Sequence, residues 1–514
     1  MLLKLKQYQR LFILIFAPFF IISCSSDSND DESISLDSFS VTLSSKNTVP
    51  QITAEGSGSA LLSLNRETGA LTGSITLSGL TGAVTAAHIH HAIAGSTGGI
   101  VVALSEDGSN ANQYNVPSNT TLSSSEQSAL LNSEYYINVH TAANASGEVR
   151  GQITGSNQDV IRVELAGENQ VPTAVTSSNS GVAYVTVNKL TGEIRGSIKN
   201  TGLDDATAAH IHSAFAGANG GIVSGLIQGV DVSIWNIDNN TILDTTQLGD
   251  LLAGGLYFNV HTPANTSGEA RGQIIPEGIE HDRVVLSGDN QIPNAVSSAG
   301  SAVAYITVNE TSGAITAHII TEGLTDTTVA HIHSGFAGTN GSIVLDLIQD
   351  VDNFSSATGD SLDTSALADF LAGKLYFNVH TTTNAAGDVR GQIQPEHIHV
   401  TRDLLDGSQS VPAVETVATG VGYTTVNEDD GTITANVRTA DITATAAHIH
   451  QGAAEEGAGA IIIGLTQDGT DTDFWSATGT LSSSQLGAYK ANETYFNIHS
   501  DAEPAGEIRS QINY

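Results

Sequence analysis

Short runs of β-branched and apolar residues alternate along the chain with turns that contain Asn, Asp and Gly. Residues 182–187 and 314–320 are two such runs, and each has the length and composition of a β-strand. Next to them, residues 188–192 and 309–313 place Asn and Gly where a tight hairpin needs them. The pattern predicts antiparallel strands joined by short turns.

Residues 363–371 depart from this pattern, because their apolar residues are spaced three and four apart. Ser123 with Glu126, and Asp244 with Gln247, have the spacing of an N-terminal capping pair at corresponding points of the chain. We predict one short helix at each of these points.

Two signatures recur four times in the same order. The first is H-x-H followed by a Gly-rich turn and an apolar run, and its first histidine is His88, His210, His331 or His448. The second is Y-x-N-x-H followed by an acidic residue, x and Arg, as in YINVHTAANASGEVRGQI from residue 136. The period of about 120 residues is long enough for a whole domain rather than a stacking unit.

We therefore predict four tandem domains at residues 36–155, 158–276, 280–396 and 399–514, with Pro276 and Pro395 in short connectors. The expected fold is all-β, each domain being an antiparallel β-sandwich or Greek-key barrel with one short helix.

The first 23 residues have the features of a signal peptide. Lys4, Lys6 and Arg10 precede an apolar run of about a dozen residues, whereas a membrane-spanning helix needs about 20. The run ends in Ile-Ile-Ser-Cys, which resembles a lipobox with Cys24, the single cysteine, as the acylation site. The alternative is an ordinary signal peptide followed by an unmodified cysteine.

Residues 24–35 form a small, polar, acidic stretch that is predicted to be a flexible tether. It resembles the acidic tag that follows the lipid cysteine of surface-exposed bacterial lipoproteins. The prediction is thus an exported lipoprotein, anchored in the outer membrane through Cys24 and facing outward.

Charge excludes one class of partner. Removing residues 1–23 takes away three basic residues and no acidic one, which leaves 15 basic against 54 acidic residues and a net charge of −39. A chain this acidic is repelled by phosphate backbones, so nucleic acid is not an expected partner.

A histidine triplet recurs in every repeat. In His88-Ile89-His90 both imidazoles share one face of a strand, about 6.6 Å apart at about 3.3 Å per residue. A third histidine follows in the second signature, so the four triplets are His88/His90/His140, His210/His212/His261, His331/His333/His380 and His448/His450/His499.

Three neutral imidazoles can hold zinc or copper. The competing hypothesis is a structural hydrogen-bond network. The same tripeptide occurs as His397-Ile398-His399 in a connector without the second signature, so H-x-H alone does not indicate a metal site. Both hypotheses stay open at this stage.

One arginine also recurs at a fixed offset, as Arg150, Arg271, Arg390 and Arg509. Strand alternation places each on one face with the acidic residue two positions earlier: Glu148, Glu269, Asp388 or Glu507. A cross-strand ion pair with that residue or a neighbour is the expected structural role. The alternative is an anion-attracting group beside a metal. The Gly-rich loops, such as residues 94–99, lack the Lys of a phosphate-binding loop, and their glycines are expected to supply positive φ.

The pattern AHIH, Gly-rich turn, F-N-V-H-T and G-E-x-R-G-Q-I resembles the CHRD (chordin) domain family over nearly the whole chain after the leader. The resemblance implies an extracellular binding protein without a generally assigned catalytic activity. The fourth copy departs most, with Ser500, Glu503, Pro504 and Ser510 at otherwise shared positions. The order of Gly-Leu, H-x-H, later His and Arg is also similar to a reduced copper/zinc superoxide dismutase, but the fourth copper histidine, separate zinc ligands and disulfide of that enzyme are missing.

The leading hypothesis is therefore a non-enzymatic surface lipoprotein with a multivalent binding, adhesive or spacer function, directed at an extracellular protein or polysaccharide. The alternative is a metal-binding protein, or a metal-dependent, superoxide-dismutase-like enzyme, that uses the histidine triplets. No catalytic residue is assigned.

Overall fold

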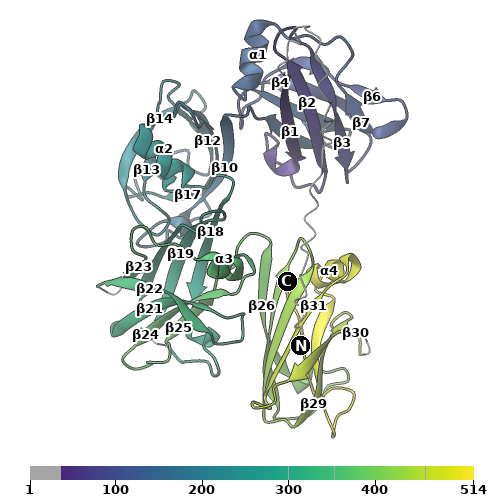
Figure 1. Cartoon of the computed structure of the whole chain (residues 1–514), viewed down its shortest axis with the longest axis vertical. Helices are drawn as coiled ribbons and strands as arrows, with labels where there is room; N and C mark the ends of the chain where they lie inside the picture. Colours follow the sequence, from purple (N-terminus) through teal and green to yellow (C-terminus); the bar gives the residue numbers. More distant parts are fainter. Residues whose placement is uncertain (1–35, 299, 352, 458) are drawn as a thin grey trace, which may run out of the picture.

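The structure, a computed structural model, describes residues 36–298, 300–351, 353–457 and 459–514. The predicted signal peptide, Cys24 and the tether lie outside the described residues. No helix among the residues described is both long and apolar enough to cross a membrane. Figure 1 shows the four repeats as separate, barrel-like β-structures, each with one short helix, so the predicted fold class is confirmed.

The elements of the four repeats follow the same order. Repeat 1 contains β1 (Leu36–Ser44), β2 (Ser57–Asn65), β3 (Leu71–Ser78), β4 (Val84–His91), β5 (Gly99–Ala103), β6 (Ser105–Asp107), β7 (Asn110–Asn115), α1 (Ser124–Leu131), β8 (Tyr135–Thr141) and β9 (Val149–Ile153). Repeat 2 contains β10 (Gln158–Ala166), β11 (Ser180–Asn188), β12 (Ile194–Thr201), β13 (Ala208–Ser213), β14 (Gly221–Gln228), β15 (Ile234–Ile237), α2 (Thr245–Leu252), β16 (Leu256–His261) and β17 (Ala270–Ile274).

Repeat 3 contains β18 (Ile279–Leu286), β19 (Ser301–Asn309), β20 (Ile315–Glu322), β21 (Thr327–Ser334), β22 (Ser342–Asp350), β23 (Asn353–Ser355), α3 (Thr364–Leu371), β24 (Leu375–Thr381) and β25 (Val389–Gln392). Repeat 4 contains β26 (Ile398–Asp406), β27 (Thr419–Asn427), β28 (Thr432–Ala440), β29 (Ala444–Gln451), β30 (Ala460–Gln467), β31 (Phe474–Thr480), α4 (Ser483–Lys490), β32 (Thr494–Ser500) and β33 (Ile508–Gln511). Four 3-10 turns, η1 (Ser45–Asn47), η2 (Gly167–Asn169), η3 (Gly288–Asn290) and η4 (Gly407–Gln409), follow the first strands.

Each repeat is an antiparallel, barrel-like sheet with an equivalent strand order. Repeat 2 closes in the order β10-β11-β12-β15-β14-β13-β16-β17, and repeat 4 closes in the equivalent order. In repeat 3 the last contact is a two-residue bridge between Ser287 and Arg390. In repeat 1 the counterpart of β14 is divided at Leu104 into β5 and β6. Closure leaves few unpaired strand edges, which otherwise invite association between chains.

Strand alternation fills each barrel with apolar side chains. Ile89, Ile137 and Val139 point into the core of repeat 1, and Leu130 of α1 joins the same cluster. The helices begin at the predicted caps: Ser123 and Asp244 form capping boxes with Glu126 and Gln247. The structure therefore confirms the strand, hairpin and helix predictions and leaves the alternate residues of each strand on the outside of the barrel.

Consecutive repeats meet at a recurring joint. The Gly-rich loop of one repeat packs on a tyrosine of the next, as Gly217 does against Tyr305. Gly217 has φ of +83°, and a Cβ there would lie 2.7 Å from His318 Cβ and 2.9 Å from the Tyr305 ring. Gly95 and Gly338 also have positive φ, as predicted for these loops, and pack in the same way. Glycine is therefore required at the joint for backbone conformation and for close approach.

The joint gives the first prediction. Gly217→Ala should separate repeats 2 and 3, because the new methyl overlaps Tyr305 and His318. Scattering should show a larger radius of gyration, and proteolysis near Pro276 should accelerate. Gly359→Ala is the matched control, since Gly359 has φ of +88° but nothing within 4 Å of the added Cβ. Equal behaviour of the two variants would show that the joint does not depend on this contact.

Candidate metal centre

The H-x-H tripeptide lies on β4 and its equivalents, next to the strand of the third histidine. Ile89 is fully buried in the core, so His88 and His90 point outward from the barrel. The pairing of β4 with β5 shifts between Ile89 and His90, which is a β-bulge, and the same shift recurs in the other repeats. Such a bulge re-aims a side chain. Here it directs the second histidine toward the Gly-rich loop.

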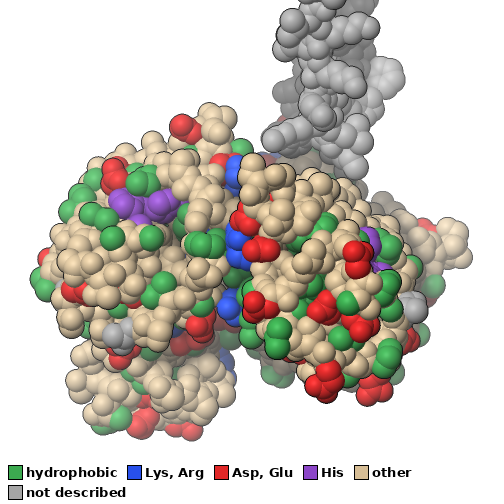
Figure 2. Space-filling view, turned by 90° about the horizontal axis from the view of Figure 1, so that it is seen from below, with side chains coloured by type: hydrophobic (Ala, Val, Ile, Leu, Met, Phe, Trp, Pro, Cys, Tyr) green, Lys and Arg blue, Asp and Glu red, His purple; other side chains and the backbone are tan. Residues whose placement is uncertain are grey.

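The structure brings every predicted triplet together. In each repeat one ligand atom from each of the three histidines lies within 4.8 Å of the others, on the outer face of the barrel. The Nδ1 of His210 is 3.0 Å from Nε2 of His261, and the equivalent atoms are 3.2 Å apart in repeat 3 and 3.1 Å apart in repeat 4. Figure 2 shows histidine side chains reaching the surface of the left-hand lobe as one compact group.

Backbone carbonyls fix the orientation of two imidazoles in each site. The second histidine donates its Nδ1–H to the Gly-rich loop, at 3.0 Å from His90 to Gly98 O and at similar lengths from His212, His333 and His450. The third histidine donates Nδ1–H to the following loop, at 2.9 Å from His140 to Ala145 O. Neutral imidazoles held in this way keep Nε2 as a free lone pair, as is usual for metal-binding histidines.

In every repeat, the Nε2 lone pair of the second histidine has no hydrogen-bond partner among the described residues. The Nε2 atoms of His90, His212, His333 and His450 are buried and form no hydrogen bond with the described residues. The first and third histidines of repeats 2 to 4 can satisfy each other, but the second cannot. An unsatisfied buried acceptor costs about 1–3 kcal/mol. Its recurrence in all four repeats favours a metal ligand over a closed hydrogen-bond network.

Burial also keeps these imidazoles neutral. Desolvation lowers the pKa of His90, His212, His333 and His450 below the usual value, against the raising effect of the loop carbonyl. Desolvation also lowers the pKa of His88, His210 and His448. Neutral nitrogen donors are therefore available at neutral pH, which is the state that zinc and copper require.

A tyrosine that the sequence analysis missed supports each site. The Tyr136 ring stacks on His90 with ring centroids 5.0 Å apart, and the guanidinium carbon of Arg150 lies 3.6 Å from the centre of the Tyr136 ring. Because β8 lies between β4 and β9, Tyr136 is placed between His90 and Arg150. The same stack forms at Tyr257, Tyr376 and Tyr495. The sequence signal was available, because a tyrosine recurs four residues before each third histidine.

The predicted ion pair of the recurring arginines is wrong. Glu148 instead accepts hydrogen bonds from Thr81 and Thr141, and Arg150 donates to the carbonyl of Ile93. Arg271 and Arg390 likewise donate to loop oxygens. Burial lowers the pKa of Arg390 to about 10, so it remains a cation at neutral pH. An aromatic face and loop oxygens, rather than a carboxylate, therefore contact these arginines.

The repeated geometry agrees with the family comparison. The CHRD domain family matches residues 39–153, 161–274, 283–393 and 402–512. The chain belongs to the CHRD domain family. No curated protein matches the chain. Its four CHRD domains make it a repeat protein of binding or structural modules.

The fourth CHRD domain keeps the site despite its departures from the other three. His499 donates Nδ1–H to Pro504 O at 3.0 Å, and Ser500 donates to Glu507 as Thr141 does to Glu148. His397 and His399 belong to none of the histidine groups among the described residues. In the third domain a carboxylate, Asp346, lies 3.5 Å from His331 Nε2 but outside the histidine group.

The tyrosine stack gives the second prediction. Arg271→Lys should destabilise repeat 2 by about 2 kcal/mol, because lysine cannot keep both the planar stack on Tyr257 and the bonds to loop oxygens. Denaturation followed by Trp235 fluorescence, in a Trp475→Phe background, reports this repeat. Lys199→Gln is the control, since its ion pair is exposed and contributes little. Equal midpoints for both variants would contradict the stabilising role of the stack.

Proposed function

We propose that this protein is an exported, surface-anchored lipoprotein whose four CHRD domains act as a multivalent metal-binding module. Each domain holds one zinc or copper ion through the three histidines of its triplet. The single observation that supports this most is the buried, unpartnered Nε2 of His90, His212, His333 and His450. The proposal extends the general role of CHRD domains as binding modules.

The donor set fits a borderline transition metal. Nδ1 of the first histidine and Nε2 of the other two converge, and two nitrogen ligands on one metal stand about 3.3 Å apart when each bond is about 2.0–2.1 Å. The 3.0 Å separation of His210 and His261 is close to that spacing. Imidazole suits zinc and copper, whereas calcium and magnesium require oxygen ligands. A bound ion would supply a Lewis-acidic centre at the barrel surface.

The proposed anchoring of the protein at the cell surface is supported by other observations. The leader and Cys24 predict export and lipidation, and the acidic tether predicts a module held away from the membrane. Because the four sites lie on one chain, a partner bound at one site meets the other sites at a high effective concentration. An extracellular protein or a polysaccharide is the kind of partner that such an array suits.

Metal stoichiometry gives the third prediction. The chelated and dialysed chain, given excess Zn²⁺ and dialysed again, should retain about four ions by elemental analysis, one for each site. His212→Ala should reduce the stoichiometry by one ion, because it removes the buried Nε2 ligand of repeat 2. His397→Ala should leave it unchanged, since this histidine lies outside the triplets.

Fewer than one metal per chain would overturn the proposal, and a loss of stability in the metal-free His212→Ala variant would then favour a hydrogen-bonded network. Turnover of superoxide by the loaded chain, lost in the same variant, would move the function from capture to catalysis.

The pH dependence gives the fourth prediction. The folded pKa of His90 and its equivalents is lowered, so the folded apo-protein binds fewer protons than the unfolded chain. The stability of the apo-protein should therefore be full above the unfolded pKa of about 6.5 and should fall as the pH drops below it. Zinc occupancy should fall over the same acidic range, because protons compete for the lone pairs. Occupancy that does not change from pH 8 to 5 would contradict histidine ligation.

A further inference from the structure

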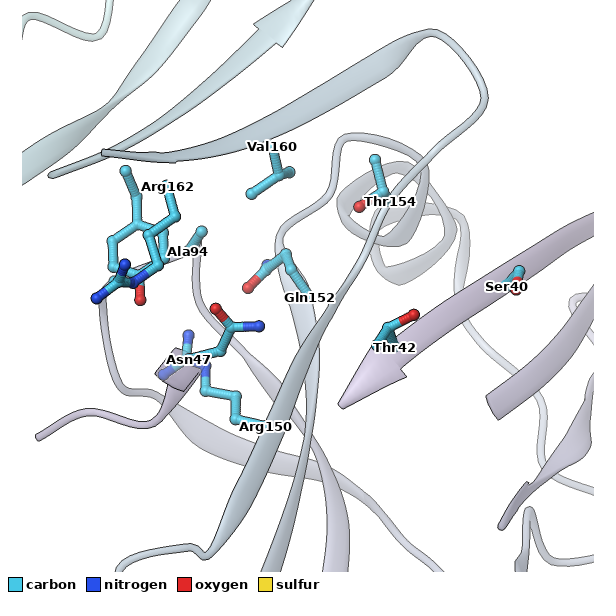
Figure 3. Close-up of a pocket in the computed structure, with 11 residues that line it drawn as sticks. Ser40, Thr42, Asn47, Ala94, Arg150, Gln152, Thr154, Val160 and Arg162 are labelled. Carbon is cyan, nitrogen blue, oxygen red and sulfur yellow. The ribbon is translucent and has the colours of Figure 1, made fainter. Parts of the chain in front are cut away.

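The first joint encloses a cavity with two arginines and no acidic side chain. It has a volume of about 210 Å³ and lies between repeats 1 and 2. Arg150 and Gln152 come from β9, and Arg162 comes from β10 of the next repeat. Figure 3 shows the polar ends of Arg150, Arg162, Gln152 and Asn47 facing a common space. Two of only 18 basic residues therefore converge in a chain with a net charge of −36.

The arginine of this joint recurs in each repeat that follows another repeat. Arg162 is the cross-strand partner of Tyr184, and the same Arg–Tyr pair recurs as Arg283 with Tyr305 and Arg402 with Tyr423. Repeat 1 has no preceding repeat among the described residues and carries Ser40 opposite Leu61 at these positions. The arginine therefore occurs only where a preceding repeat supplies the other half of the cavity. Figure 2 shows the same preference, with Lys and Arg side chains gathered along the seam between two lobes.

Arg150 is a buried cation that stacks on Tyr136 but has no carboxylate partner among the described residues. The residue is only 3% exposed, and the single hydrogen bond of its guanidinium within the described structure is 3.4 Å long, to Ile93 O. The equivalent Arg271 and Arg390 each bond a loop asparagine, Asn219 or Asn340, where repeat 1 has Thr97. A buried charge without a counter-ion is costly. An anion in the cavity would remove that cost.

Arg162 and Gln152 each leave a further polar atom without a partner. The Nε–H of Arg162 and the Oε1 of Gln152 are buried and form no hydrogen bond with the described residues. Arg162 donates from Nη1 to Glu164 and from Nη2 to Gln51, but the Glu164 carboxylate is 71% exposed and neither partner lines the cavity. The cavity therefore offers donors for an oxyanion and one acceptor for a hydroxyl or N–H group. Asn47, Ser40 and Thr42 line it as well.

We propose that this cavity binds a small hydroxylated carboxylate, of the size of a single sugar acid, between Arg150 and Arg162. The carboxylate lies between the two guanidinium groups, and a ligand hydroxyl donates to Gln152 Oε1. The site is independent of the proposed metal sites, because none of the twelve triplet histidines lines it. The equivalent cavities between repeats 2 and 3 and between repeats 3 and 4 include Asp282, and the former also includes Glu164 and Glu168. These carboxylates oppose a second and a third anion, so we infer one ligand per chain.

Calorimetric titration of the chelated full chain with glucuronate tests the proposal. We expect one site per chain, and binding to glucose, which lacks the carboxylate, should be at least about tenfold weaker. Acetate, which lacks the hydroxyls, should also bind more weakly than glucuronate. The ligand could be a free sugar acid or the end of a polysaccharide, and an oligoglucuronate tested in parallel distinguishes the two. Tighter binding of the oligomer than of glucuronate identifies a polysaccharide end, and equal binding identifies a free sugar acid.

The matched variants are Arg162→Gln and Arg283→Gln. Arg162→Gln should weaken glucuronate binding at least about tenfold, since it removes one charged donor and leaves the Arg150–Tyr136–His90 stack in place. Arg283→Gln, at the cavity that contains acidic residues, should bind glucuronate as the parent does. His212→Ala should also bind glucuronate normally, which separates this test from that of the metal sites.

The absence of glucuronate binding to the folded parent would overturn the proposal. Binding that Arg162→Gln leaves unchanged would do so as well, and so would equal binding of glucose and glucuronate.

Discussion

A buried guanidinium lying on the face of a tyrosine recurs beside the histidine triplet of every repeat. Arg150 remains charged at neutral pH, so its burial requires a favourable surface, and the ring of Tyr136 at 3.6 Å provides it. The same ring stacks on His90, whose Nδ1–H is bonded to Gly98 O. The orientation of the imidazole is thus fixed by an aromatic plane and by a carbonyl. One tyrosine therefore supports the histidine triplet on one side and the arginine of the joint on the other.

The joints give the four repeats an order along the chain. Each internal joint needs a glycine with positive φ in one repeat and an Arg–Tyr pair in the next, as Gly217 with Arg283 and Tyr305 shows. Repeat 1 lacks the pair, and Leu61 at the tyrosine position is 65% exposed. Repeat 4 has Glu455 at the position of that glycine, where a side chain would overlap a following tyrosine. Terminal units that differ in this way are a general property of tandem arrays.

The sequence predicted the features that depend on local periodicity. Alternation placed His88 and His90 on one face, the capping spacing of Ser123 and Glu126 located α1, and the glycines of the loops supplied positive φ. It did not predict contacts that depend on which strands are neighbours. Alternation placed Glu148 and Arg150 on one strand face, yet Glu148 lies just before β9 and accepts hydrogen bonds from Thr81 and from Thr141 at the end of β8. The joint was also missed, because Arg162 and Tyr184 acquire a role only when the preceding repeat is in place.

In metal capture, the net charge of the chain would attract cations and the imidazole ligands would select among them. The excess of acidic residues attracts cations of every kind toward the surface and raises their local concentration. The triplets offer neutral nitrogen, which calcium and magnesium bind poorly and which zinc and copper prefer. None of the four histidine groups includes a carboxylate among the described residues, so hard cations would find no oxygen ligand from these groups. In repeat 3 Asp346 lies 3.5 Å from His331 Nε2, on the side of the ring away from Nδ1, so this carboxylate would orient a ligand histidine rather than add a donor.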